Sequence, residues 1–350
     1  MSECVALLEQ IRGCCSQRWT VMEVCGGQTH ALLRHGLDRL LEDSIELIHG
    51  PGCPVCVTDS ERIDQAIALV KKPEVTLCSY GDMLRVPGSD GSNLLGCRSE
   101  GADVRVIYSP LDVLEIAGRE TDRQVVFLAV GFETTAPATG LLVQQAHQQR
   151  LTNLRLLMAH VRVAPALDQL LGDPACTVQG LLAAGHVCAV MGEAEYVDLA
   201  AQHRRPIVMT GFSPEALLRG ILCCIKQLEE GRHDLRNAYE AVVDQGGNRD
   251  ARRLIETVFE PVDRVWRGLG VIGKGGYRLR DPYSALAVEP EELDGQPYGN
   301  GQCPSGQVLR GLMRPGDCPS FGDACTPAHP LGAPMVSSEG ACAAYFRFHH

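Results

Sequence analysis

Four cysteines near the C-terminal end of the chain have the residue type and the grouping of a metal centre. They are Cys303, Cys318, Cys325 and Cys342, with 14, 6 and 16 residues between successive members. Four thiolates suit either a 4Fe-4S cluster or a tetrahedral zinc ion. The spacing is that of neither a ferredoxin nor a zinc ribbon with paired C-x2-C motifs. Because free cysteine is also a common small core residue, the alternative is that these side chains only pack.

A second group of thiols, Cys53 and Cys56, lies in the segment 50–56, GPGCPVC. This segment follows an apolar run that we expect to be a strand and precedes a helix expected to begin near Ser60. A C-x-x-C pair at such a turn has thioredoxin-like placement, and the helix dipole would lower the pKa of the first cysteine and make it the nucleophile. We therefore predict a redox dithiol, with half a metal site or a structural pair as the alternatives.

A third motif begins at Cys25 and runs Cys-Gly-Gly-Gln-Thr-His to His30. At the exit of an apolar strand, the two glycines would leave the sulfur exposed where a helix begins. A thiolate and an imidazole together suit iron or another late transition metal. On this motif alone, a buried cysteine near a surface histidine is the more common arrangement.

Two other residues have open roles. Glu133, in the run GFETT over 131–135, could enter the same cleft or cap a helix. His186, in the run AGHV over 184–187, is expected to be an ordinary core histidine. Neither residue identifies a function by itself.

The composition excludes several classes of protein. With 32 basic and 43 acidic residues, the net charge is −11, which argues against a nucleic-acid-binding surface. No run approaches the ~18 apolar residues that span a bilayer, and charged residues interrupt the N-terminal segment, so we expect a cytoplasmic chain without a signal peptide or membrane contact. In a reducing compartment, 16 cysteines favour metal binding or thiol chemistry over disulfides.

The first 230 residues alternate short apolar runs with amphipathic runs, which predicts an α/β fold with βαβ units and parallel sheets. A weak internal repeat, in which an apolar strand ends at glycine before a polar helix start, favours two α/β domains in tandem. In such sheets the working site lies beyond the carboxyl ends of the strands. The expected strands are 21–25, 45–48, 75–78, 104–108, 125–130, 154–158 and 207–210. The expected helices include 29–41, 60–71, 136–150 and 214–230.

These patterns divide the chain into three domains. Residues 1–120 would form an α/β domain with the first three functional thiols, and residues 121–230 would form a second α/β domain. Beyond them, 232–266 has a charged, helical pattern, 268–277 is rich in glycine, and the remainder has little periodicity. Such an irregular segment needs another source of order, and a metal centre is one. Residues 231–350 are therefore expected to be a helical and irregular domain that holds the four-cysteine centre.

Taken together, these motifs resemble those of the HypD maturation factors of NiFe hydrogenases. The likeness extends over nearly the whole chain, and three of its cysteine motifs are highly specific in combination. One departure is Ser213, where an acidic residue of a Gly-Phe-Glu-Pro motif would be expected. The matching stretches are 25–30, 50–56, 131–135, 185–187 and 303–342, the last of which includes the run MVSSEGAC over 335–342.

The resemblance implies a function in assembling the iron centre of NiFe hydrogenase, Fe(CN)2CO, which carries two cyanides and one carbon monoxide. Members of that family work with a small chaperone, HypC, and receive cyanide from a HypE partner. They have two α/β domains and a third domain that holds a 4Fe-4S cluster. The residues implied here are Cys25 as iron ligand with His30 nearby, Cys53 and Cys56 as redox dithiol, Cys303, Cys318, Cys325 and Cys342 as cluster ligands, and Glu339 as a polar functional residue of the tail.

Two other functions remain open at this point. A general cytoplasmic thiol–disulfide oxidoreductase would use Cys53 and Cys56 and would hold a structural zinc ion in the tail. A pure scaffold would bind the iron and two partners without any electron transfer. Iron content separates the first of these from the maturation factor, and a redox titration of the dithiol separates the second.

Overall fold

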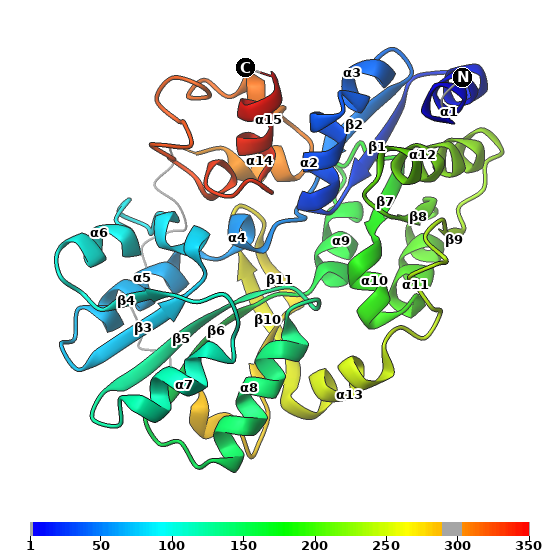
Figure 1. Cartoon of the computed structure of the whole chain (residues 1–350). Helices are drawn as coiled ribbons and strands as arrows, with labels where there is room; N and C mark the ends of the chain where they lie inside the picture. Colours follow the sequence, from blue (N-terminus) through cyan, green and yellow to red (C-terminus); the bar gives the residue numbers. More distant parts are fainter. Residues whose placement is uncertain (1–2, 289–302, 350) are drawn as a thin grey trace.

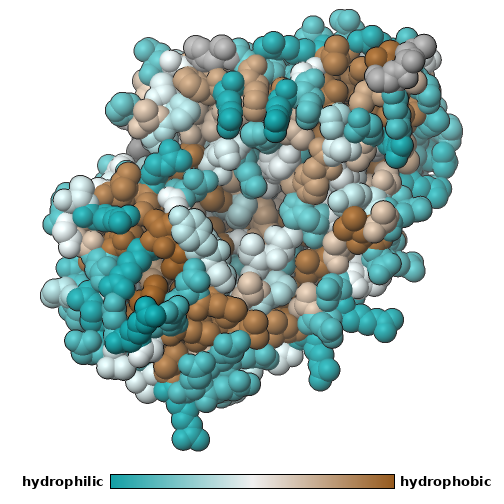
Figure 2. Space-filling view, viewed as in Figure 1, coloured by the Kyte–Doolittle hydropathy of each residue, from teal (hydrophilic) through white to brown (hydrophobic). Residues whose placement is uncertain are grey.

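The computed structural model describes residues 3–288 and 303–349, and it confirms an α/β fold with two parallel sheets. Helices flank both sheets, and a small C-terminal unit lies beside α2 and α4 (Figure 1). In the same view, hydrophilic residues dominate the outline of the molecule, whereas paler and more apolar residues line the hollow at its centre (Figure 2). Within the described ranges, no helix is long and apolar enough to cross a membrane.

The first sheet has the strand order β2-β1-β7-β8-β9, and every neighbouring pair is parallel. Its strands are β1 (Trp19–Glu23), β2 (Ile45–His49), β7 (Gly180–Ala184), β8 (Ile207–Thr210) and β9 (Leu235–Asn237). One face packs on α1 (Glu3–Cys14), α2 (Gly26–Arg34), α3 (Leu37–Leu41) and α12 (Pro214–Glu229). The other face packs on α9 (Val163–Leu171), α10 (Gly185–Met191) and α11 (Ala194–His203).

The second sheet has the strand order β4-β3-β5-β6 and is also parallel throughout. Its strands are β3 (Val75–Ser79), β4 (Val104–Val106), β5 (Gln124–Gly131) and β6 (Leu154–His160). One face packs on α5 (Ser60–Val70), α6 (Leu94–Ser99) and the 3-10 turn η1 (Gly81–Arg85). The other packs on α7 (Asp112–Arg119), α8 (Ala136–Gln148) and α13 (Arg249–Val258). Both faces are covered, as the apolar strands require.

The two sheets are not divided at residue 120 of the chain, so the predicted domain ranges 1–120 and 121–230 need correction. The first sheet combines strands before residue 50 with strands after residue 179, and the second sheet takes all the strands between them. All seven predicted strands are present, with ends shifted by at most two residues. The strand that joins the two halves of the first sheet, β7, was missed because Gly-Leu-Leu-Ala-Ala contains no β-branched or aromatic residue.

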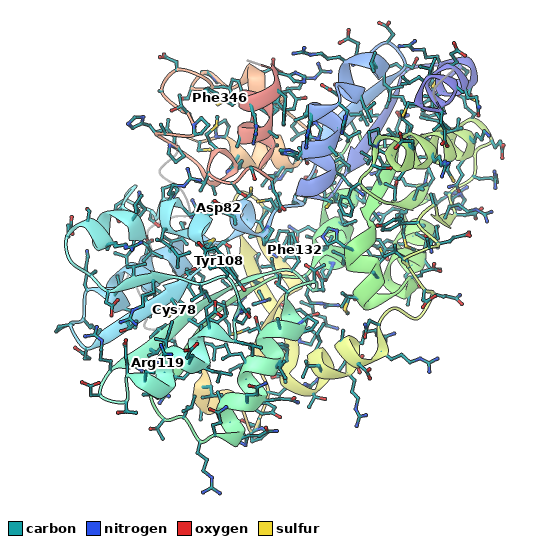
Figure 3. All side chains as sticks on the ribbon, viewed as in Figure 1. Cys78, Asp82, Tyr108, Arg119, Phe132 and Phe346 are labelled. Atoms are coloured by element: carbon teal, nitrogen blue, oxygen red, sulfur yellow. The ribbon has the colours of Figure 1, made fainter. Side chains whose placement is uncertain are left out.

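A β-hairpin lies between the two sheets and replaces part of the helix predicted over 232–266. Only α13 is helical there, and β10 (Phe259–Trp266) pairs antiparallel with β11 (Gly270–Leu279) across the glycine-rich segment. The fully buried Trp266 donates from its indole nitrogen to the carbonyl of Gly275 at 2.9 Å. It also packs at 5.9 Å on Phe132, which follows β5 and is labelled near the middle of Figure 3. Tertiary packing thus outweighs the weak strand propensity of glycine.

The tail is mostly irregular, as predicted, but it ends in a helix that was not predicted. The described part contains α14 (Ser305–Leu309), the 3-10 turns η3 (Pro315–Asp317) and η4 (Ala333–Met335), and α15 (Ala341–His349). Helix α15 packs against α2, where the ring of Phe348 meets His30 edge to face at 5.0 Å. The C-terminal segment therefore lies directly on the first sheet's Cys25 motif (Figure 1).

Candidate metal and redox site

Cys25 and His186 meet beyond the carboxyl ends of two neighbouring strands. Strands β1 and β7 pair in parallel with Glu23 opposite Leu182, so the residues that follow them emerge at the same edge. The sulfur of Cys25 lies 3.7 Å from Nδ1 and 4.0 Å from Nε2 of His186. Sequence reasoning assigned His186 to the core because β7 was not recognised. Had β7 been placed beside β1, His186 would have been expected next to Cys25.

The thiol of Cys25 is 3% exposed, and this burial raises its pKa to about 12. Backbone N–H groups at the start of α2, from Gln28 and Gly27, act in the opposite direction, whereas the charge of Glu23 raises the pKa further. Desolvation therefore outweighs the start of the helix here. A metal ion would reverse that balance, because a coordinating thiol is deprotonated outright.

A buried carboxylate, Glu23, fixes the backbone around Cys25. It is fully buried and accepts hydrogen bonds from the backbone nitrogen of Cys25 at 2.9 Å and from the hydroxyl of Thr29. Its other close partner is Nδ1 of His49 at 2.7 Å, at the end of β2. Glu23 and His49 were not among the predicted site residues. The available signal was a charged residue inside the apolar run VMEVC, which is rarely buried without a partner.

The dithiol segment packs directly on Cys25. A side chain at Gly52 would overlap the backbone of Cys25, and the nitrogen of Gly26 donates to the carbonyl of Gly52 at 2.9 Å. Only glycine permits this approach. Cys53 is the N-cap of the short helix α4 (Pro54–Val57), which contains Cys56, and the sulfur of Cys53 accepts from the nitrogen of Cys56 at 3.3 Å. The two thiols are therefore placed together, beside Cys25.

The surroundings of Cys56, the second thiol of the pair, favour its protonated form. Cys56 is almost fully buried, and burial together with its neighbour Cys53 holds the pKa of Cys56 well above the usual thiol range. The thiol of Cys342 and the carboxylate of Glu339 act in the same direction. Cys53 and Cys56 are close enough in the chain to form a disulfide, but the surroundings of Cys56 hold its thiol in the protonated form.

The tail packs on the Cys25 loop at Glu339 and on the dithiol segment at Gly340. A side chain at Gly26 would overlap Glu339, and a Cβ at Gly340 would lie 3.0 Å from the sulfur of Cys56. Burial raises the pKa of Glu339, and the charge of His30 partly offsets this. The structure thus brings Glu339 to the Cys25 and Cys56 loops. His30 packs on α15, and the sulfur–imidazole contact of Cys25 is made by His186 instead.

The four tail cysteines line one small cavity. Together with Phe321 and Met335, these four side chains (Cys303, Cys318, Cys325 and Cys342) surround about 20 Å³. Burial raises the pKa of Cys342, and negative charge on the other three thiols would raise it further. In residues 3–288 and 303–349, no three His, Cys, Asp or Glu side chains stand in metal-binding geometry. The donor set fits four-thiolate coordination, whereas the volume holds about one water. Holding a cluster therefore requires these side chains to separate.

Two residues with open roles have structural partners. Glu133 is buried, and its Oε1 accepts from the backbone nitrogen of Val163, the first residue of α9, at 3.0 Å. Burial raises the pKa of Glu133 to about 7. Ser213 caps α12, accepting from the nitrogen of Ala216 at 3.2 Å. The serine thus has a local structural function at the position where the sequence departs from the expected motif.

Comparison with known proteins identifies the family of this chain. The profile of the HypD family, described as "Hydrogenase formation hypA family", matches residues 2–349. The hydrogenase maturation factor HypD of Rhodobacter capsulatus is 42% identical over 99% of this chain and 94% of its own length. The HypD proteins of Rhizobium leguminosarum bv. viciae and Escherichia coli (strain K12) are 43% and 42% identical, over 93% and 94% of this chain and 87% and 88% of their own lengths. The chain therefore belongs to the HypD family of hydrogenase maturation factors.

Proposed function

We propose that this chain assembles the Fe(CN)2CO unit of NiFe hydrogenase in the cytoplasm, with the cargo iron held by Cys25. A HypC-type small chaperone and a HypE-type cyanide donor would be its partners. The observation that carries the proposal is the convergence of three segments at one point. The Cys25 loop, the dithiol loop at Gly52 and the tail at Glu339 are in van der Waals contact, although the tail is separated from the others by more than 280 residues.

The chemistry of Cys25 suits this cargo. Iron(II) that carries cyanide and carbonyl is a soft centre, and a thiolate is a matching ligand. The imidazole of His186, 3.7 Å from the sulfur, can approach the same iron or donate a hydrogen bond to a cyanide nitrogen. Because Glu23 holds the Cys25 backbone from behind, the sulfur is fixed in place before the cargo arrives.

The dithiol would supply electrons next to this cargo. If Cys53 and Cys56 joined in a disulfide, an S–S bond would form, and the two electrons and two protons lost by the pair would pass to the cargo iron and its ligands, which would be reduced. The contact between Gly52 and Cys25 places this chemistry beside the iron ligand. The four tail cysteines would hold a 4Fe-4S cluster, which supplies one-electron transfer when bound. Glu339 and Gly340 join the tail to both loops.

Infrared spectroscopy tests this function, because bound cyanide and carbonyl absorb where protein does not. The chain would be purified anaerobically after co-expression with both partners. We expect cyanide and carbonyl bands in the complex of the chain with the small chaperone. Bands confined to the small chaperone would contradict the assignment of Cys25. Stoichiometric zinc without iron in the tail would favour the general thiol–disulfide oxidoreductase instead.

A further inference from the structure

The guanidinium of Arg267 lies at the junction between the dithiol segment and the tail. Arg267 begins the turn between β10 and β11, and its backbone nitrogen donates to the carbonyl of Val57, next to Cys56, at 2.9 Å. Its Nε donates to the carbonyl of Thr58 at 2.8 Å, and Nη2 donates to the carbonyl of Pro87 at 2.7 Å. These bonds hold the side chain in one position against the end of α4.

Arg267 has no close counter-ion among the residues that the structure describes. Its hydrogen bonds go to neutral carbonyl oxygens, and no described carboxylate forms an ion pair with it within 4.0 Å. Burial lowers the pKa of Arg267, and Asp59 is the strongest of the acidic groups that act against this. A partly buried cation without a paired anion is costly. Arginine nevertheless keeps its charge at neutral pH.

The cavity beside Arg267 adjoins the four-cysteine cavity. Arg267, Asp59 and Cys303 line a space of about 280 Å³, and Cys303 also lines the small cavity that contains Cys318, Cys325 and Cys342. Ser305 and Gly332 belong to both linings as well. One of the four thiols that would bind a cluster thus lines the same cavity as this cation. Burial lowers the pKa of Arg267, and negative charge on Asp59 and then on Cys303 would oppose this.

We propose that Arg267 is the counter-cation of the centre held by the four tail cysteines and sets its reduction potential. The inference rests on the proposed function, because it requires a 4Fe-4S cluster in the tail. Four thiolates leave such a centre net negative, and reduction adds one electron without a proton. A fixed cation in the cavity that Cys303 lines stabilises the reduced form more than the oxidised form, and it therefore raises the potential.

The test is a redox titration of the cluster in the anaerobic full-length chain, with dithionite as reductant and the cluster absorbance as readout. In Arg267→Gln, the ratio of reduced to oxidised cluster at a fixed potential should fall about tenfold, equivalent to about 59 mV for a one-electron couple. Arg267→Lys keeps the positive charge but not the planar guanidinium. Its ratio of reduced to oxidised cluster should therefore lie within about threefold of the wild-type ratio.

Arg264→Gln is the matched control. Arg264 lies on the same hairpin and also lacks a described carboxylate partner, but the cavity of about 570 Å³ that it lines contains no cysteine. Replacing Arg264 should leave the midpoint potential of the cluster unchanged. The same loss in Arg267→Lys as in Arg267→Gln would show that docking of the hairpin, not charge, is responsible, and it would overturn the inference. An unchanged midpoint in Arg267→Gln overturns it too, whereas a wild-type chain without any cluster overturns the proposed function as well.

Discussion

The sulfur of Cys25 and Nδ1 of His186 are 3.7 Å apart, although 160 residues separate them in the chain. This contact is available only because β1 and β7 are neighbours in one sheet. It replaces His30 as the histidine nearest the proposed iron ligand, and it gives the first prediction a matched pair of variants.

Cys25→Ser should abolish the cyanide and carbonyl infrared bands while the tail cluster and the fold remain, because serine replaces a soft ligand with a hard one. His186→Ala should reduce or shift these bands, since its imidazole faces the sulfur. His30→Ala should have a smaller effect because His30 packs on α15. Bands of wild-type intensity in Cys25→Ser would show that the iron is held elsewhere.

The cysteine pair can be tested independently of the iron. Cys56→Ala should abolish maturation of the hydrogenase but leave the cluster spectrum unchanged, because Cys53 then has no partner for an S–S bond. Mass spectrometry of alkylated protein should detect the reversible disulfide in the wild type only. Cys223→Ala, a partly buried cysteine on α12, serves as the control. Normal hydrogenase activity with Cys56→Ala would exclude a redox role.

Loss of one tail thiol should unfold the tail locally. Cys318→Ala is expected to lose the cluster and to become sensitive to proteolysis between residues 303 and 349, since metal binding and local order are coupled there. Iron content and limited proteolysis measure the two effects. Cys14→Ala, at the end of α1, should change neither. Retention of the full cluster in Cys318→Ala would mean that other ligands hold it.

The contact between the Cys25 loop and the tail depends on a missing side chain. Gly26→Ala would force a methyl group into Glu339, and we expect a loss of about 1–3 kcal/mol in the free energy of unfolding together with weaker cluster binding. Gly13→Ala meets no atom within 4 Å and lies in α1, so it should be neutral or stabilising by up to about 1 kcal/mol. Urea unfolding compares the two, and equal stabilities would contradict this packing.

Glu133 predicts a pH dependence of stability. Its pKa rises from 4.5 to about 7 on folding because of burial, so the native state binds this proton more tightly than the unfolded state. The stabilisation is complete below pH 4.5 and is lost as the pH rises through about 7, by up to about 3 kcal/mol. Glu133→Gln should flatten this part of the profile, measured by urea unfolding between pH 5 and 8. An identical slope in the variant would rule out Glu133 as its source.

The strands and the cysteine motifs could be predicted from the sequence, because local patterns determine both. Apolar runs such as 125–130 identify buried strands, and each thiol motif is contiguous in the chain. What local patterns omit is which strands are neighbours. Without β7, neither the place of His186 nor the interleaving of the two sheets could be inferred. The hairpin at Trp266 was missed for a related reason, because its glycine-rich strand is stabilised by partners distant in sequence.

The interleaved sheets also govern the order in which the nascent chain can fold on the ribosome. The second sheet is complete once β6 has been synthesised, whereas β1 gains its neighbour β7 only after roughly 130 more residues have followed β2. Closing so long a loop is entropically costly, so this pairing forms late. Until then, Cys25 and the dithiol are exposed to oxidants on an unfinished sheet. The proposed loading of iron at Cys25 therefore belongs after the synthesis of residues 303–349, which pack on the Cys25 and Cys56 loops.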